Sequence, residues 1–319
     1  MKKGVFICII VLFLAVLASA ALPAYPAVRI AVTIQPYYLM LDELRTGNVE
    51  VRRLIDASQN PHTFSPTVQQ AKLLYDSDIV LYNGLHLESY LESTLVSIKN
   101  GGKTVIAVSD FLSRDRLLAG RHHHDEDLEH GTTPETQPED SHEEEPGSVE
   151  HPSDFNPHIW LDPVFLSVAI IPGLRDLLIS VDPGNQAHYL SKSQQMIASI
   201  DKLQLEMNTY LSAYSGKTVL MSHPSFAYFF ERYGLKLDSI FEGEGDEPSV
   251  SEMKEMIDSL KEKKIIALFM EPQQPRRYVE ILSKEGKIGI GTLDPLGWNA
   301  SSIVELLMSN FEEIKRVFP

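Results

Sequence analysis

The sequence predicts an α/β protein built from two lobes with central, mostly parallel sheets, joined by one long rigid helix. Two observations support this fold class. Short runs rich in β-branched residues alternate with amphipathic helical stretches in both halves of the 319-residue chain, and this alternation is typical of parallel strands with helical crossovers. An uninterrupted helical pattern separates the two halves and therefore predicts a rigid link.

The first twenty residues, MKKGVFICIIVLFLAVLASA, have the pattern of a secretory signal peptide. Lys2 and Lys3 precede an apolar run that ends at the small-residue sequence Ala18-Ser19-Ala20. We therefore exclude residues 1–20 from the fold and expect a periplasmic protein. An uncleaved anchor is the alternative, but the apolar run is short for a membrane span. Cys8 lies inside this run, so we expect neither a lipid anchor nor a disulfide in the mature chain.

Residues 21–181 are predicted to form the N-terminal lobe. Strands are expected at 28–33, 49–54, 78–82 and 104–108, and helices at 37–44, 67–75 and 87–98. Residues 215–319 are predicted to form the C-terminal lobe. Strands are expected there at 217–221, 237–241, 265–269 and 287–292, and helices at 225–233, 251–263, 278–284 and 301–317.

Residues 182–214 are predicted to be the helix that links the lobes. Asp182 is a suitable N-cap and Pro183 suits the first helical position. Apolar residues then recur at spacings of three and four, at Met196, Ile200, Leu203, Met207, Tyr210 and Tyr214. About thirty residues of helix span roughly 45 Å. A stiff link of this kind predicts little motion between the lobes on binding.

A tract of histidines and carboxylates occupies residues 121–151, inside the predicted N-terminal lobe. It contains eleven carboxylates, one arginine and six histidines, namely His122, His123, His124, His130, His142 and His151. Because it has almost no apolar residues, we expect a disordered loop. Imidazole and carboxylate together suit zinc, so we expect weak auxiliary zinc sites that gather or sense the ion. A solvated acidic linker is the alternative.

The formal charge of −16 and the absence of a basic patch argue against a nucleic-acid partner. Four residues outside the tract are candidates for a tight metal site. They are His62, His158, His223 and Asp294, each in a turn next to proline. Three of them follow predicted strands, and ligands of open α/β sheets bind beyond the carboxyl ends of strands. If both lobes face each other there, the four side chains complete a tetrahedral zinc shell in the interlobe cleft.

Two further residues are weaker candidates. Glu271 follows the predicted strand at 265–269 and is either a fifth ligand or, as we favour, a carboxylate that orients a metal-bound histidine. His86 follows the strand at 78–82 and is more consistent with packing or with hydrogen bonding behind the ligands. His188 lies on the linking helix, where we expect it to be exposed.

The motifs NPHTFSP, YNGLHLESYLE, NPHIWLDP, SHPSFAYF, FMEPQ and TLDPLG occur in this order along the mature chain. In that order they resemble the zinc-specific periplasmic solute-binding proteins of ABC metal importers. The resemblance implies two α/β lobes on a long helix, with His62, His158, His223 and Asp294 at the metal positions. Manganese-binding relatives tend to carry glutamate where His223 stands, so the resemblance implies zinc. It also implies a membrane permease as partner, and we expect a monomer.

The sequence therefore predicts an extracytoplasmic protein that captures Zn²⁺ and delivers it to an ABC-type importer. A closed four-ligand shell leaves no position for a substrate, so no enzymatic activity is expected. Three alternatives stay open: a Mn²⁺-binding protein of the same class, an exported zinc hydrolase, and a metal-independent adhesin. Manganese prefers more oxygen ligands, and the chain has no HExxH motif.

Overall fold

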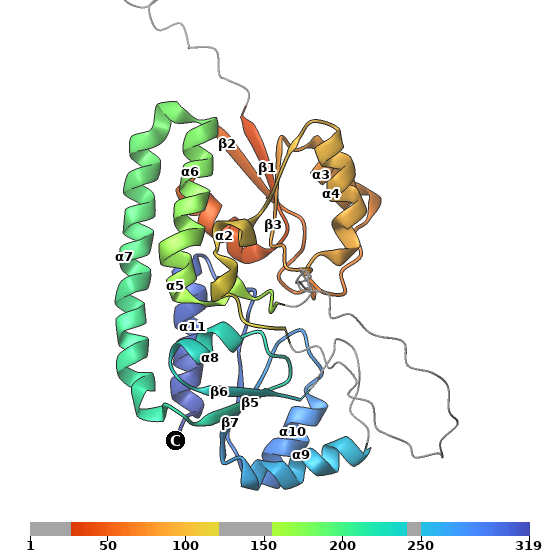
Figure 1. Ribbon diagram of the computed structural model, residues 1–319, viewed down its shortest axis with the longest axis vertical. Helices are drawn as coiled ribbons and strands as arrows, with labels where there is room; N and C mark the ends of the chain where they lie inside the picture. The colour runs from red at the N-terminus through yellow and green to blue at the C-terminus, as the bar shows by residue number, and fades with distance from the viewer. Residues whose placement is uncertain (1–26, 121–154, 241–249) are drawn as a thin grey trace, which may run out of the picture.

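We determined the fold from a computed structural model of the chain, which describes residues 27–120, 155–240 and 250–319. The predicted signal peptide at 1–20 and the predicted tract at 121–151 lie outside the described residues. Figure 1 shows two α/β lobes, one above the other, with a single long helix running along the side of both. The predicted fold class is therefore confirmed.

The N-terminal lobe contains a four-stranded sheet in which every strand pair is parallel. The strands, in the order β2-β1-β3-β4, are β1 (Val28–Val32), β2 (Val49–Arg53), β3 (Ile79–Tyr82) and β4 (Thr104–Ala107). The helices between them are α2 (Gln35–Leu44), α3 (Val68–Asp76) and α4 (Glu92–Asn100). Ile30, Ala31 and Val32 are fully buried, as expected for a central strand of a parallel sheet covered on both faces.

The C-terminal lobe repeats this arrangement with a second parallel sheet. The strands, in the order β6-β5-β7-β8, are β5 (Thr218–Met221), β6 (Lys236–Ser239), β7 (Ile265–Met270) and β8 (Ile290–Thr292). The helices are α8 (Ala227–Arg232), α9 (Val250–Glu262), α10 (Arg277–Gly286) and α11 (Ile303–Val317). The strand order thus matches that of the first lobe, strand for strand.

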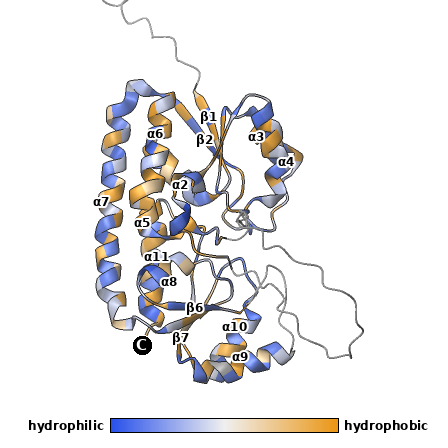
Figure 2. Ribbon diagram, viewed as in Figure 1, coloured by the Kyte–Doolittle hydropathy of each residue, from blue (hydrophilic) through white to orange (hydrophobic). Residues whose placement is uncertain are grey.

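The lobes are linked by α7 (Gln186–Leu211), which continues into one 3₁₀ turn at each end, Pro183–Asn185 and Ser212–Tyr214. Its 26 residues span about 39 Å. Met196, Ile200, Leu203 and Met207 of the predicted apolar face are buried, and Tyr210 and Tyr214 are half-buried. Figure 2 shows that α7 is largely hydrophilic on its visible side, as expected for a helix with one face in solvent.

The start of the linking helix differs from the sequence prediction in one detail. Asp182 makes no side-chain capping bond to the helix backbone. Its carboxylate instead accepts hydrogen bonds from side chains of Tyr189 and Asn185, and from Thr46 of the N-terminal lobe. Asp182 therefore fastens the helix to that lobe.

One long helical segment was not predicted. It comprises α5 (Pro163–Phe165), a π-helical turn (Leu166–Ile170) and α6 (Ile171–Val181). Pro172 and Gly173 near the start of α6 disturb the helical pattern in the sequence. Because proline has no backbone N–H to donate, it commonly causes irregular turns of this kind. By length and composition alone this segment could cross a membrane. Its residues Leu174 and Leu178 are, however, fully buried in the core.

Two element boundaries differ because the backbone adopts left-handed conformations there. Leu85 and His86 have φ angles of 52° and 64°, so the helix predicted from residue 87 begins later, as a 3₁₀ turn followed by α4 at Glu92. Lys287 has φ 52° where α10 ends, so the strand predicted from 287 begins at Ile290.

Candidate metal centre

Two histidines are placed by the same short motif, Asn-Pro-His. The Asn60 side-chain oxygen accepts a hydrogen bond from the backbone N–H of His62 at 2.9 Å, and that of Asn156 accepts one from His158 at 3.0 Å. This is the turn that an asparagine side chain makes with the backbone two residues on. The intervening proline restricts the backbone further. Both histidines therefore stand on stiff turns.

The third histidine is placed by the C-terminal sheet. His223 follows β5 and Glu271 follows β7, and these strands are parallel neighbours. Their carboxyl ends therefore meet at one edge, which is where open α/β sheets bind ligands. Glu271 Oε1 lies 3.0 Å from His223 Nδ1 and accepts a hydrogen bond from the Ser225 hydroxyl at 2.6 Å. The carboxylate is thus positioned to hold the His223 ring through Nδ1, as carboxylates commonly do for metal-bound histidines.

The structure brings His62, His158 and His223 together between the lobes. One ligand nitrogen from each lies within 4.8 Å of the other two. The Nε2 atoms of His62 and His158 are 3.0 Å apart, close to the roughly 3.3 Å that separates two nitrogens on one tetrahedral zinc ion. The three rings thus have the geometry of a metal site.

The electrostatics of His158 also favour metal binding. The side chain is 3% exposed. Burial, together with the neighbouring His223 and His62, lowers the pKa of His158 well below its ordinary value of 6.5. The ring is therefore neutral at physiological pH. A neutral imidazole keeps a nitrogen lone pair for a metal without first losing a proton.

The cavity at the histidines is small. It is lined by the three histidines, Trp160, Glu271 and residues of the surrounding turns. Its volume is about 10 Å³, which corresponds to roughly one water-sized sphere. The site therefore has room for an ion but not for an organic substrate.

Asp294 lies next to this cavity, which Pro295 and Leu296 help to line. Among the described residues, Asp294 does not belong to the group of ligand atoms that lie within 4.8 Å of one another, which only the three histidines form. Its two oxygens accept backbone N–H bonds from Leu296, Gly297 and Trp298. A carboxylate offers about four lone-pair positions, so the Oδ2 atom retains capacity for a further partner.

Among the described residues, His86 and His188 are not part of the three-histidine cluster. The exposed His86 Nδ1 is 3.1 Å from Glu92 Oε1. His188, expected to be exposed, is half-buried, and its Nε2 lies 3.1 Å from the carbonyl of Leu44. The six tract histidines lie outside the described residues.

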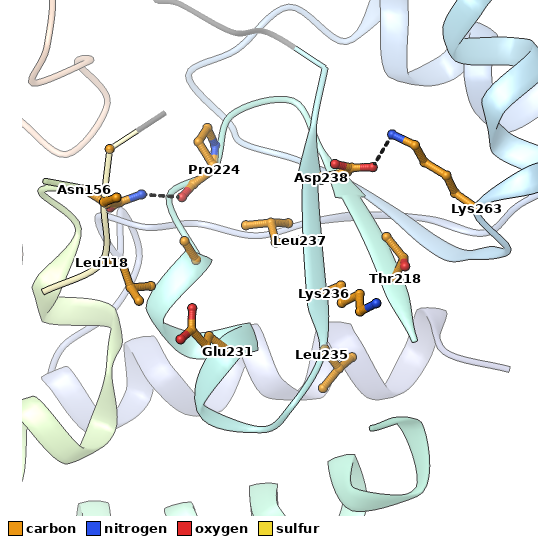
Figure 3. A pocket seen from close by; sticks show the side chains of 13 residues that line it. Leu118, Asn156, Thr218, Pro224, Glu231, Leu235, Lys236, Leu237, Asp238 and Lys263 are labelled. Atoms are coloured by element: carbon orange, nitrogen blue, oxygen red, sulfur yellow. Dashed lines mark hydrogen bonds and ion pairs between the residues drawn. The ribbon is translucent and has the colours of Figure 1, made fainter. Parts of the chain in front are cut away.

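A larger cavity of about 960 Å³ lies beside β6 and α8 (Figure 3). It is lined by Asp238 and Lys263, which form an ion pair at 2.8 Å, and by Asn156 and Pro224. No histidine is among the described residues that line it. Among the described residues, the three-histidine group lies at the smaller cavity.

Comparison with known proteins agrees with this geometry. A family model described as zinc-uptake complex component A, periplasmic, matches residues 30–317. A putative metal-binding protein of Thermotoga maritima is 37% identical over 287 residues, which cover 90% of this chain and 91% of that protein.

A further relative, with zinc in its name, and a solved structure also match this chain. The zinc-binding lipoprotein AdcA of Streptococcus pneumoniae is 27% identical over 270 residues, but this chain spans only 50% of its length. A crystal structure of ZnuA has a TM-score of 0.72 and 25% identity, and the match covers 92% of this chain and 100% of that one.

Proposed function

The chain belongs to the family of periplasmic component A of zinc-uptake complexes, and on this premise we propose that it captures Zn²⁺ outside the cytoplasm and delivers it to an ABC-type membrane importer. Members of this family are metal-binding proteins and not enzymes, so the hydrolase alternative is set aside. The observation that carries the proposal is the cluster of three imidazoles around a cavity for one ion.

The proposed ligands are His62, His158, His223 and Asp294. Three nitrogen ligands and one carboxylate suit zinc, whereas manganese prefers a shell richer in oxygen. Asp294 is proposed as the fourth ligand because its turn borders the cavity and its Oδ2 has a lone pair to offer. Glu271 is proposed to orient His223 through Nδ1.

The test is a zinc titration in competition with a chromophoric chelator. A chain lacking residues 121–151 should bind one zinc ion tightly. The same chain with all four ligands changed to alanine should lose that ion, because no rigid set of nitrogen and carboxylate ligands remains. Tight binding that survives in the quadruple variant would place the site elsewhere.

Metal preference is tested by competition between the two ions in the wild-type protein. Zn²⁺ should displace bound Mn²⁺, since three imidazoles favour the ion that ranks higher in nitrogen affinity. Retention of Mn²⁺ against equimolar Zn²⁺ would instead support the manganese alternative.

For residues 121–151 we propose an auxiliary role in gathering or sensing zinc. The support is compositional: six imidazoles and eleven carboxylates within 31 residues. Deleting these residues should remove weak zinc equivalents and leave the tight one unchanged. An unaltered total stoichiometry after deletion would contradict this role.

A further inference from the structure

Asn156 touches both halves of the metal site with one buried side chain. It is 7% exposed. Its Oδ1 lies 3.0 Å from the backbone nitrogen of His158 and 2.9 Å from the Nδ1 atom of the same histidine ring. Its Nδ2 donates a hydrogen bond at 3.1 Å to the carbonyl of Pro224, the residue after His223. Figure 3 shows this last bond between Asn156 and Pro224.

The partners of Asn156 determine which way its amide faces. The Pro224 carbonyl only accepts hydrogen bonds, so the NH₂ group must point toward it. The backbone N–H of His158 only donates, so the carbonyl oxygen must point toward His158. The two requirements come from different lobes and agree. They assign the amide orientation without ambiguity between oxygen and nitrogen.

The amide orientation in turn determines the tautomer of His158. A carbonyl oxygen 2.9 Å from Nδ1 requires a proton on Nδ1. A neutral imidazole has one N–H, so Nε2 then carries the lone pair. Nε2 is the atom that lies 3.0 Å from Nε2 of His62. Asn156 therefore presents to the metal the nitrogen that faces the other ligands.

We propose that Asn156 is a positioning residue of the metal site, which holds His158 in the Nδ1–H tautomer and ties this ligand to the turn that carries His223. This inference rests on the proposed metal-binding function. The neutral amide of Asn156 would hold Nδ1 of His158, just as the Glu271 carboxylate holds Nδ1 of His223. Partners that hold the second nitrogen of a metal-bound histidine commonly change metal affinity by about 10–100-fold when they are removed.

The surroundings of Asn156 strengthen the inference, because they hold the residue itself in place. Its backbone N–H donates to the Leu118 carbonyl, and its carbonyl accepts a 2.8 Å hydrogen bond from the Tyr228 hydroxyl. Asn83, which is fully buried, donates to the carbonyl of the following Pro157. The Asn156–His158 turn is thus held from both lobes.

The test is the tautomer of His158 in the metal-free protein, read from the ring nitrogens by NMR after labelling histidine with ¹⁵N. The wild type should show Nδ1–H. Asn156→Asp keeps an acceptor for that proton and should retain the tautomer. Asn156→Ala removes the acceptor and should lose it. Asn156→Ser, whose hydroxyl is able to hold the backbone turn but too short to hold the ring, should also lose it and serves if the alanine variant does not fold.

Zinc affinity is measured on the same variants. Asn156→Ala should bind zinc about 10–100-fold more weakly. Asn185→Ala is the matched control, because the Asn185 amide also makes two hydrogen bonds, to Asp182 at the start of the linking helix, and its loss should leave zinc affinity unchanged. A wild-type tautomer in both the alanine and serine variants would overturn the inference even if zinc binds as proposed. If the wild type bound no zinc, the proposed function would fail, while the tautomer result would still decide the role of Asn156.

Discussion

Glu88 is a carboxyl group buried in the N-terminal lobe, where it accepts hydrogen bonds from neutral donors. It is 2% exposed. Burial raises the pKa of Glu88 from its ordinary value of 4.5 to about 7, although hydrogen bonds from the Thr33 hydroxyl and from the backbone N–H groups of Asn83 and Gly84 favour the ionised form. These contacts give the carboxyl group a structural role, because it satisfies the backbone N–H groups of Asn83 and Gly84, which precede the left-handed residues Leu85 and His86.

The raised pKa of Glu88 predicts a pH-dependent stability. Between pH 4.5 and 7 the folded protein holds a proton on Glu88 that the unfolded chain has released, so the contribution of Glu88 to stability is greatest below pH 4.5 and is lost as pH rises through 7. The loss amounts to about 3 kcal/mol. Glu88→Gln cannot titrate and should lack this component.

The measurement is urea unfolding of metal-free wild type and Glu88→Gln at several pH values. The effect of Glu88 is the difference in the free energy of unfolding between the two proteins at each pH. This difference is needed because His158, whose pKa is lowered, acts in the opposite direction in both proteins: the stabilisation from His158 is lost as pH falls below 6.5. Parallel pH profiles for the two proteins would contradict the prediction.

At the scale of single elements, most helices and strands follow from local pattern, but α6 does not. Alternating β-branched and amphipathic runs predicted the strands of both sheets to within a few residues at their ends. The segment from Pro163 to Val181 was missed because Pro172 and Gly173 argue locally against a helix. Burial against the rest of the core compensates for their poor helix propensity, which is a tertiary effect that a local pattern does not contain.

Gly173 shows what the core requires at this point. A Cβ atom at position 173 would lie 2.6 Å from the ring of Phe111. Gly173→Ala should therefore lower the free energy of unfolding by about 1–3 kcal/mol, because the crowded ring has to move. Gly184→Ala is the matched control, since a Cβ there meets nothing within 4 Å, and its effect should stay within about 0.5 kcal/mol. Chemical denaturation of both variants checks this, and equal stabilities would show that Phe111 yields without cost.

At the scale of the whole molecule, the two lobes share one hydrophobic core as well as the linking helix. The same cluster of buried residues contains Ile30 of β1 and Phe269 of β7. Polar contacts add to it across the cleft. Trp160 donates to the Pro295 carbonyl at 2.7 Å, and Arg232 forms an ion pair at 2.5 Å with Asp162, whose side chain is 1% exposed. Separating the lobes would expose apolar surface and leave that buried carboxylate without its cation.

Little motion between the lobes is therefore expected when the ion binds. Small-angle scattering of the chain lacking residues 121–151 should give the same radius of gyration with and without zinc. The Arg232→Gln variant, which lacks the cation of the interlobe ion pair, is measured in the same way, and its radius of gyration is compared with that of the chain that keeps Arg232. An expansion of the wild type on zinc removal, of the kind seen when hinged lobes open, would contradict a rigid link.

The sequence by itself determined the class of the fold and the residues that compose the three-histidine cluster, because strand and helix periodicity and the Asn-Pro-His turns are local properties. The tertiary structure decided which partners those residues have. The contacts of Asn156 with Pro224 and of Trp160 with Pro295 join positions 68 and 135 residues apart, and no local pattern specifies such distant pairs. The helix at Pro163–Val181 likewise depends on burial against the core. The hydrogen bonds that tie the His158 turn to the other lobe therefore came only from the packing of the two lobes against each other.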